Sequence, residues 1–497
     1  MVDAVATPTV SSKLAAPPAV AVHRPETTLW TRFAYGFGSV AFGVKDNGFS
    51  YFLLIFYSQV IGLDSRLVSL ALTVALIFDA FVDPLIGYWS DNLRSRWGRR
   101  HPFMYAAAIP VSLSYLLLWR PPVGWSSGEI FWYLLVFAIL IRVTITFFTT
   151  PSTALAPELS SSYDERSALM SFRYYFAWTG GNLMSVLMFG ALFPLFATAA
   201  IPNGQFNREA YAVYGLIASG LIFLSIMVSA AGTHSRIPHL HAAPPKRRLT
   251  PIIMFREIFE TLFNRSFAAL FLSTVFGSIA GGLSAALAFY FLTYFWAFSA
   301  FENFLVTSSV FVSAVIGAVL APIVTRTLGK KRGAIILGFI AFVGSPLPVM
   351  LRLAGVLPPN GSPFVFWFVL IAIMIDVGLI ICFQILGSSM MADLVEQAEL
   401  KTGRRAEGVF FSATTFTQKL VSGIGIMAAG FVLAAAACPK GADPAHVSPD
   451  ALWRLGAYYV PLILTFWMSM VAVIAFYRID RTSHEDNLRK LAESRSQ

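Results

Sequence analysis

Twelve long apolar segments, joined by shorter polar connections, run along most of the chain. They cover residues 33–61, 66–90, 102–119, 130–155, 168–197, 211–231, 266–296, 302–325, 333–353, 363–391, 406–437 and 452–477. Most exceed the ~18 residues that an α-helix needs to cross a bilayer. They do not alternate apolar with polar residues, as the strands of a membrane β-barrel would. The pattern therefore predicts an all-α membrane protein with twelve transmembrane helices.

The longest connection, residues 232–265, divides the twelve segments into six plus six. A glycine followed by basic residues occurs after segment 2, at Gly98, and again after segment 8, at Gly329. Two six-helix repeats of this kind are typical of carriers whose halves are related by an axis along the membrane normal. We expect bundles at 30–231 and 266–477, with a disordered cytoplasmic tail at 1–29 and a second cytoplasmic tail at 478–497.

The connection between the halves has a helical pattern of its own. Phe255, Ile258, Phe259 and Leu262 recur at helical spacing within the sequence FREIFETLFNR. This spacing predicts an amphipathic helix that lies in the membrane interface. Three histidines precede it without a neighbouring thiol or carboxylate, so a solvated loop is favoured over a metal site; they are His234, His239 and His241.

The distribution of basic residues predicts the orientation. Connections that follow even-numbered segments carry most of the loop Lys and Arg residues, including Lys246, Lys330 and Lys331. Because positive loops stay in the cytoplasm, these connections and both termini are expected there. In a bacterium the membrane would be the inner membrane.

Composition agrees with a membrane protein. The chain has 497 residues, of which 57% are hydrophobic and 12% charged, and a formal net charge of +10. A soluble domain carries about 25% charged residues. The basic excess is explained by positive loops and needs no nucleic acid partner, and two cysteines are too few for a zinc site or a disulfide framework.

Seven ionisable residues nevertheless lie inside the apolar segments. A charge at the centre of a bilayer costs about 2.5–3.5 kcal/mol on insertion scales, so these side chains are expected to face a polar cavity or one another. Arg142 and Asp376 suit a structural ion pair as well as a functional role. The seven are Lys45, Asp46, Asp79, Asp83, Arg142, Asp376 and Lys419.

Asp79 and Asp83 are the most informative pair. They are four residues apart, so they share one helix face. Two carboxylates this close in an apolar medium resist being ionised together and need a proton, a metal cation or a basic side chain beside them. Hard oxygen ligands favour small hard cations, while carboxylate protonation remains open. Asp91, at the end of the same segment, is predicted to form a gating or structural ion pair with nearby arginines.

Four sequence blocks make the interpretation specific. They are AYGFGSVAFGVKDNGFS (34–50), DAFVDPLIGYWSDNLRSRWGRRHPF (79–103), APELSSSYDERSALMSFR (156–173) and MADLVEQAELKTGRRAEGVFFSATTFTQK (391–419). In this order they resemble the glycoside–pentoside–hexuronide:cation symporters of the major facilitator superfamily, the family of melibiose permease. The resemblance covers the transport core of both halves. It implies a twelve-helix fold, alternating access and symport driven by sodium, lithium or protons.

The resemblance also assigns candidate roles. Asp79 and Asp83 match the cation-binding acids of the family, and Thr146 matches a hydroxyl beside them. Lys45, Asp46, Arg173 and Lys419 match polar residues that line its sugar pocket. Lys419 can also supply the positive charge that the two acids need when the cation site is empty. A cytoplasmic gate is expected at Asp91, Arg94, Arg96, Arg99 and Arg100. No cofactor other than the coupling ion is expected, and the carrier is expected to work as a monomer.

The chain departs from the family in the expected sugar pocket. Thr149 stands where sugar-transporting members carry an acid, and Thr153 and Gln384 stand where they carry tryptophans. The cation site is thus expected to be intact, and melibiose to be a poor substrate. Another sugar or glycoside, held also by Thr414, Thr415 and Gln418, is the first expectation. An anionic sugar or a lysophospholipid-like compound is the alternative.

Other classes of function fit less well. A proton-linked exporter of amphipathic compounds is a rival within transport. A polytopic membrane enzyme would need a nucleophile with its base, or clustered metal ligands, near a membrane face. The apolar segments contain no histidine, and Cys382 and Cys438 are far apart in the sequence. The sequence therefore favours a carrier over an enzyme.

Overall fold

The computed structural model describes residues 26–160, 163–240, 265–402, 407–438 and 447–477. Every regular element in these ranges is helical, and eleven helices are long and apolar enough to cross a membrane. In the first half of the chain they are α4 (Ser65–Asn92), α5 (His101–Leu118), α6 (Ser127–Leu159), α7 with η3 and α8 (Tyr163–Leu195), and α9 (Arg208–His234). In the second half they are α11 with η6 (Arg265–Phe295), α12 (Ala300–Thr327), α13 with α14 (Lys330–Leu353), α15 (Pro363–Thr402), α16 (Glu407–Ala435) and α17 (Pro449–Ile474). The prediction of an all-α membrane fold is confirmed.

The first predicted segment is a succession of short helices. It comprises α1 (Leu29–Phe37), α2 (Ser39–Asn47), η1 (Gly48–Phe52), α3 (Leu53–Ile55) and η2 (Phe56–Val60), with π-helical geometry in η1 and η2. Close packing against α7 depends on Gly43, because a Cβ there would lie 1.8 Å from the carbonyl oxygen of Ala177. Small residues allow this approach between membrane helices. Counted with the eleven longer helices, this interrupted one gives the twelve that the sequence predicts.

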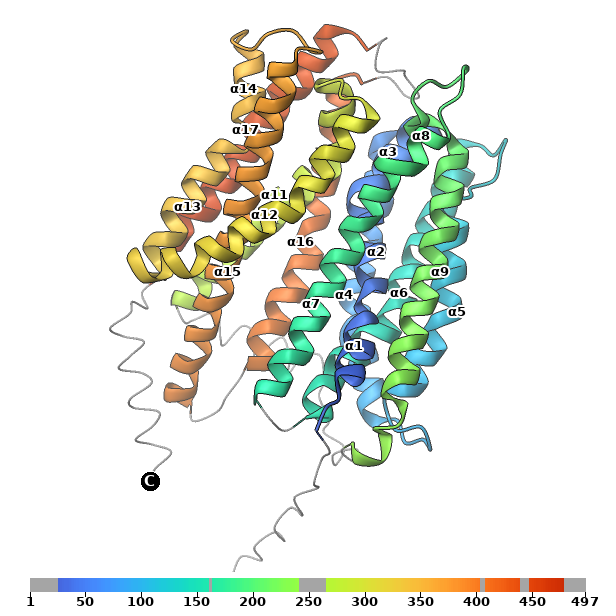
Figure 1. The fold of residues 1–497 in the computed structure, drawn as a ribbon, viewed down its shortest axis with the longest axis vertical. Helices are drawn as coiled ribbons and strands as arrows, with labels where there is room; N and C mark the ends of the chain where they lie inside the picture. The colour runs from blue at the N-terminus through green and yellow to red at the C-terminus, as the bar shows by residue number, and fades with distance from the viewer. Residues whose placement is uncertain (1–25, 161–162, 241–264, 403–406, 439–446, 478–497) are drawn as a thin grey trace, which may run out of the picture.

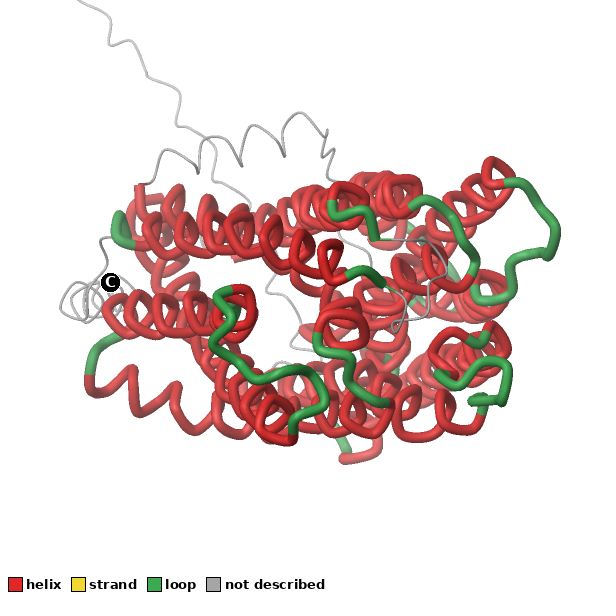
Figure 2. Tube along the Cα trace, turned by 90° about the horizontal axis from the view of Figure 1, so that it is seen from above, coloured by secondary structure: helices red, strands yellow, loops and turns green. Residues whose placement is uncertain are grey.

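The helices form two bundles, one from each half of the chain. Figure 1 shows α1–α9 on one side and α11–α17 on the other. Figure 2, seen from above, shows the described part of the chain as helices joined by loops. Between the bundles, α16 packs against α4, and α12 packs against α7. We call the end of the molecule that holds α3, α8 and α14 the upper end, and the end where α1 begins the lower end (Figure 1).

Helix capping explains where two helices begin at the upper end. Ser126 and Glu129 form a capping box at the start of α6, and Ser299 and Glu302 form one at the start of α12. Each box satisfies backbone N–H groups that have no partner within the helix. These are the fourth and eighth membrane-spanning helices along the chain. Both begin with a capping box of a serine and a glutamate.

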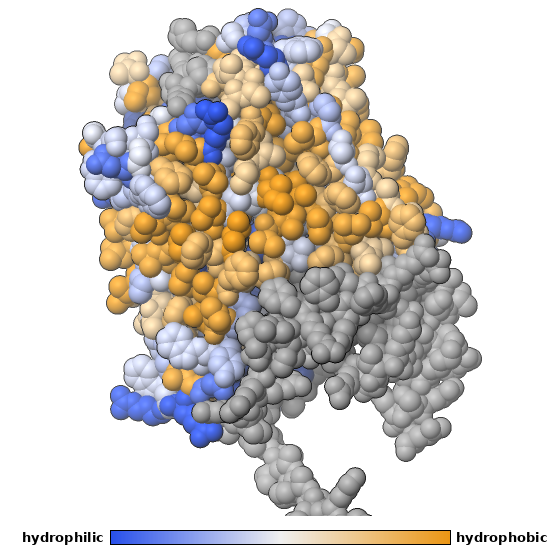
Figure 3. All heavy atoms as spheres, turned by 180° about the vertical axis from the view of Figure 1, so that it is seen from behind, coloured by the Kyte–Doolittle hydropathy of each residue, from blue (hydrophilic) through white to orange (hydrophobic). Residues whose placement is uncertain are grey.

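The two bundles bury their helices to different degrees. Trp119, Tyr115, Tyr211 and Tyr214 are fully buried near the upper end of the first bundle. In the most apolar 18-residue stretch of α15, in the second bundle, only 22% of the residues are buried within the protein. The corresponding share for α5, in the first bundle, is 56%. The surface left over is apolar, and Figure 3 shows hydrophobic residues gathered over the middle of one face, with hydrophilic patches toward its ends. This is the surface of a multi-pass integral membrane protein.

Some predictions concern residues outside those described. The amphipathic helix at 255–265 lies almost wholly in the undescribed range 241–264, as does His241, and most of the tail at 1–29 and all of that at 478–497 are also outside. His234 corrects the expectation of solvated histidines. It is half-buried in the last turn of α9, where its Nδ1 lies 3.1 Å from the Tyr105 hydroxyl.

Candidate cation and substrate site

The two predicted acids lie at the centre of the protein, on the face of α4 that meets α6 and α16. Asp79 is near the midpoint of α4 and Asp83 is one turn closer to the lower end. Their surroundings differ in accessibility, because the Asp79 side chain is 3% exposed and that of Asp83 is 26% exposed. The α4 helix thus carries one enclosed carboxylate and one that is more open.

Lys419 connects both acids to the other bundle. Its Nζ lies 3.0 Å from Asp79 Oδ2 and 2.5 Å from Asp83 Oδ2. Because Lys419 belongs to α16 and the acids belong to α4, this shared ion pair crosses between the bundles. A cation bound by the two carboxylates would have to compete with the lysine.

A hydroxyl and a second basic residue complete the cluster from α6. The Thr146 hydroxyl lies 3.1 Å from Asp79 Oδ1 and 2.9 Å from Asp83 Oδ1. Arg142, one turn away, donates from Nη1 to Asp79 Oδ2 at 3.3 Å. The sequence named Arg142 as an intramembrane charge without assigning its partner. Its guanidinium also lies 4.8 Å from the centroid of the Phe49 ring.

Lys45 and Asp46 form a second ion pair, on α2, close enough to the acid cluster for Lys45 to interact electrostatically with Asp79 and Arg142. The Lys45 Nζ lies 3.4 Å from Asp46 Oδ1. Lys45 is almost completely buried and stands over the Phe42 ring, whereas the Asp46 side chain is 53% exposed. The pair balances its own charge, and the Phe49 ring has both cations near it, with Lys45 at 5.9 Å and Arg142 at 4.8 Å from its centroid.

Arg173 lies in a different polar group, nearer the lower end. Its guanidinium donates to the hydroxyl of Ser152 at 3.0 Å and to that of Thr153 at 2.6 Å. Thr153 follows Thr146 by seven residues on α6, which is about 10 Å along a helix. The structure thus brings together Arg173 and Thr153, two of the residues predicted to line the substrate pocket.

The remaining candidates for the substrate pocket are more open. Gln384 on α15, and Thr415 and Gln418 on α16, are exposed, and Thr149 on α6 is half-buried. The Thr149 carbonyl oxygen accepts a hydrogen bond from the Thr153 hydroxyl at 2.7 Å. The side chain of Thr414 lies outside the described part of the structure.

The predicted gate residues form an ion-pair cluster within the first bundle. Arg100 lies 3.2 Å from Asp91, and both Arg99 and Arg100 contact Glu158 of α6, at 2.5 and 2.6 Å. The prediction missed Glu158, although it lies in one of the four quoted blocks, because an acid beside an apolar segment carries no distinguishing signal. Arg96 stands over the Trp97 ring, and Arg94 is exposed.

The structure shows the surroundings of two more polar residues, Asp376 and His101, which the sequence did not predict. Asp376 lies close to Ser345, at the break between α13 and α14, and its buried Oδ1 has no hydrogen-bond partner among the described residues. No described basic residue forms an ion pair with it. His101 begins α5, is fully buried and lies 3.0 Å from the Thr233 hydroxyl. The sequence had placed His101 just outside the third segment.

Neutral contacts join the bundles at the upper end. The hydroxyls of Ser58 and Tyr290 are hydrogen-bonded, and the Tyr294 hydroxyl donates to Gln59 at 3.1 Å. Thr293 donates to Gln205 at 2.8 Å. Deeper in the interface, the Thr73 hydroxyl donates to the carbonyl oxygen of Gly423 at 2.7 Å.

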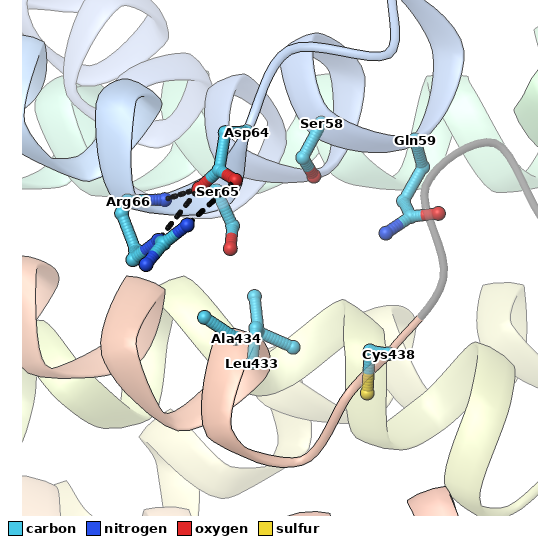
Figure 4. A pocket seen from close by; sticks show the side chains of 8 residues that line it. All are labelled: Ser58, Gln59, Asp64, Ser65, Arg66, Leu433, Ala434 and Cys438. Carbon is cyan, nitrogen blue, oxygen red and sulfur yellow. Dashed lines mark hydrogen bonds and ion pairs between the residues drawn. The ribbon is translucent and has the colours of Figure 1, made fainter.

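A cavity of about 210 Å³ opens beside these upper contacts. Figure 4 shows Ser58, Gln59, Asp64, Ser65 and Arg66 on one wall, facing Leu433, Ala434 and Cys438 on the other. Asp64 and Arg66 are paired with each other, at 3.1 Å. This cavity is far along α4 from Asp79, since Ser65 begins the helix and Asp79 is near its midpoint.

Comparison with known proteins places the chain in a family. Residues 34–481 match the family described as MFS/sugar transport protein. The chain belongs to this family. The predicted resemblance and the expectation of a transporter are confirmed by that match.

Named relatives cover nearly the whole chain. An uncharacterised symporter of Synechocystis is 26% identical, over 94% of this chain and 97% of the relative. The isoprimeverose transporter of Lactiplantibacillus pentosus is 23% identical, over 93% and 91%. The sodium-dependent lysophosphatidylcholine symporter 1 of Gallus gallus is 23% identical, over 95% and 91%. Among solved structures, a D-xylose–proton symporter is similar with a TM-score of 0.57, 16% identity and coverage of 88% of this chain and 97% of that one, which supports the major facilitator fold.

Proposed function

We propose that this protein is a cation-coupled symporter that moves a sugar or glycoside by alternating access. The observation that supports this most strongly is the shared ion pair between Lys419 of one bundle and Asp79 and Asp83 of the other. It lies at mid-membrane, where carriers built from two repeats hold their coupling ions. A cation that replaces Lys419 would release one electrostatic contact between the bundles.

Sodium is the proposed coupling ion, with the proton and lithium as alternatives. The Asp79 and Asp83 carboxylates and the Thr146 hydroxyl converge from two adjacent helices. They offer oxygen ligands, which small hard cations prefer. The chicken relative named sodium-dependent supports this choice. Uptake that follows a pH gradient and ignores a sodium gradient would instead identify the proton.

For the substrate, a neutral sugar or glycoside is proposed first. Lys45 with Asp46, and Arg173 with Thr153, offer hydrogen-bonding groups that are already balanced or engaged with hydroxyls. Thr149, Gln384, Thr414, Thr415 and Gln418 would contribute further neutral donors and acceptors. The relative named isoprimeverose transporter supports this class. Thr149, Thr153 and Gln384 replace the acid and aromatic groups of a melibiose-type pocket, so little melibiose transport is expected.

An amphipathic lipid is the second candidate. The relatives named lysophosphatidylcholine symporters favour it. Arg173 could then pair with a phosphate, which a guanidinium can bind bidentately. An anionic sugar would use the same residue.

For orientation, we propose that the lower end faces the cytoplasm. It carries Arg94, Arg96, Arg99 and Arg100 between α4 and α5, and Lys330, Lys331 and Arg332 at the start of α13. This follows the positive-inside rule. The cluster of Asp91, Arg99, Arg100 and Glu158 would then act on the cytoplasmic side. A bacterial inner membrane and a monomeric carrier complete the proposal.

The test is uptake by proteoliposomes that contain the purified protein. A panel of labelled isoprimeverose, lactose, melibiose, a uronate and lysophosphatidylcholine would be offered under a sodium gradient and, separately, a pH gradient. We expect accumulation of a neutral sugar driven by sodium. Accumulation of lysophosphatidylcholine alone would favour the second candidate, and no gradient-driven accumulation of any solute would contradict the proposal.

A further inference from the structure

The charges around Asp79 and Asp83 suggest how many cations the carrier takes. We propose that Arg142 is a resident counter-cation that neutralises Asp79 throughout the transport cycle, so that only the charge of Asp83 is exchanged and each cycle moves one cation. This inference rests on the proposed symport. It goes further by assigning unequal roles to the two acids and a stoichiometry-determining role to Arg142.

The first argument is the difference between the two carboxylates. Asp79 Oδ2 is shared by Arg142 and Lys419, at 3.3 and 3.0 Å, and the side chain is 3% exposed. Asp83 has Lys419 as its only basic partner among the described residues, and its side chain is 26% exposed. A cation that enters from solvent therefore reaches Asp83 more readily. When Lys419 withdraws, Asp79 still has a positive partner and Asp83 does not.

The second argument is that Arg142 cannot leave or discharge. A guanidinium remains protonated in proteins. Arg142 is 4% exposed, and its α6 helix packs against α4 within one bundle. Alternating access rocks one bundle against the other as largely rigid bodies. The contact between Arg142 and Asp79 is therefore retained, whereas Lys419 lies on the other bundle and its contacts change.

The third argument is the sum of charges. Lys45 and Asp46 pair with each other and add no net charge. The charges of the two acids, Arg142 and Lys419 then balance one another in this structure. Once Lys419 has withdrawn, one negative charge is left. One bound cation restores neutrality, and a second would leave an uncompensated charge in an apolar environment, which is strongly unfavourable.

The test counts net charge per substrate molecule in proteoliposomes. A fixed substrate gradient is opposed by a membrane potential set with potassium and valinomycin, at pH 8, and the potential of zero flux gives the charge ratio. This measurement counts sodium and protons alike. Wild type is expected to move one cation charge per neutral substrate. Wild-type uptake that responds to no cation gradient would contradict the proposed function, whatever Arg142 does.

Two substitutions then separate the roles. Arg142→Gln leaves Asp79 without its resident partner, so one additional charge per substrate is expected relative to wild type. Arg142→Lys keeps the charge and should keep the wild-type ratio. The exposed Arg120 is the matched control, and Arg120→Gln should also leave the ratio unchanged. If wild type and Arg142→Gln couple to the same number of charges, the inference is wrong.

The double variant Asp79→Asn/Arg142→Gln is the stronger test. It removes both members of the buried pair, a change that is often tolerated when neutral groups of similar size replace them. We expect its cation affinity to fall, because one carboxylate ligand is lost, while the charge ratio of the remaining accumulation stays at the wild-type value. Asp79→Asn alone should lose accumulation, because Arg142 is left unpaired. If the double variant binds substrate like wild type yet fails to accumulate it, Asp79 is itself an exchanging ligand and the inference is overturned.

Discussion

The bundles are held together in two chemically different ways, at the upper end and at mid-membrane. Upper contacts are neutral hydrogen bonds, such as those of Tyr290 with Ser58 and of Tyr294 with Gln59. The mid-membrane contact is the ion pair of Lys419 with Asp79 and Asp83. In the proposed transport cycle, a cation competes directly with the second kind of contact and not with the first. The proposed coupling ion would then control when the bundles separate, while the neutral contacts determine how firmly the upper end is closed.

The largest effect is expected from removing the more open acid. Asp83→Asn takes away the charge that pairs with Lys419 and that we propose attracts the coupling ion. Gradient-driven accumulation should be lost, with substrate binding reduced much less. Uptake against a gradient and equilibrium binding of the same labelled substrate would be measured on one preparation. Accumulation equal to wild type would remove Asp83 from the coupling site.

Removing the lysine should separate exchange from net uptake. With Lys419→Gln, the cation no longer has a competitor and should bind more tightly. The empty carrier, however, keeps an unpaired buried charge and should reorient slowly. Net uptake is expected to fall at least about tenfold, because each 1.4 kcal/mol of added barrier slows a step about tenfold, while substrate exchange across the membrane persists.

A matched control for this variant lies one helical turn along α16. Ser422→Ala changes a residue whose hydroxyl bonds to the Lys419 carbonyl and which is not part of the ion pair. It should leave net uptake and exchange near wild-type values. Equal loss of both processes in Lys419→Gln would mean that the lysine holds the fold together and does not control coupling.

The neutral contacts provide the opposite test. Tyr290→Phe removes one hydroxyl between the bundles and should favour separation of the upper end by about 1 kcal/mol, or roughly fivefold. Cys438, in the neighbouring cavity, can report this after the buried Cys382 is replaced by alanine. Burial raises the pKa of the Cys438 thiol to about 11, so little reactive thiolate is present at pH 8 in the closed structure.

Opening exposes that thiol and moves its pKa back toward about 8.5. Labelling of Cys438 by a polar thiol reagent should therefore be faster in Tyr290→Phe, with little change in cation affinity. Phe301→Leu is the control, because it is a conservative change of an exposed aromatic residue at the same end of the protein. An unchanged labelling rate, together with altered cation affinity, would contradict the separation of the two kinds of contact.

Sequence alone predicted most of the fold, because bilayer thickness imposes a length on every apolar helix. It missed the interruptions in the first helix, because the π-helical turns of η1 and η2 leave no mark in a continuous run of apolar residues. In the site, four-residue spacing placed Asp79 and Asp83 on one face. Lys419 was expected as the counter-cation of the two acids, whereas the contact of Arg142 with Asp79 was not, because it depends on how α6 packs against α4.

The smallest effect is expected at the lower end, where the charges pair within one bundle. Asp91→Ala removes a partner of Arg100 that is 51% exposed, and exposed ion pairs contribute only about 0–1 kcal/mol. Turnover should slow about twofold to threefold with cation affinity unchanged. Glu158→Gln should have the greater effect, because this acid is buried and joins both Arg99 and Arg100. Turnover and cation affinity measured for both variants would reveal the order, and a larger effect at Asp91 would show that its contacts change during transport as a gate requires.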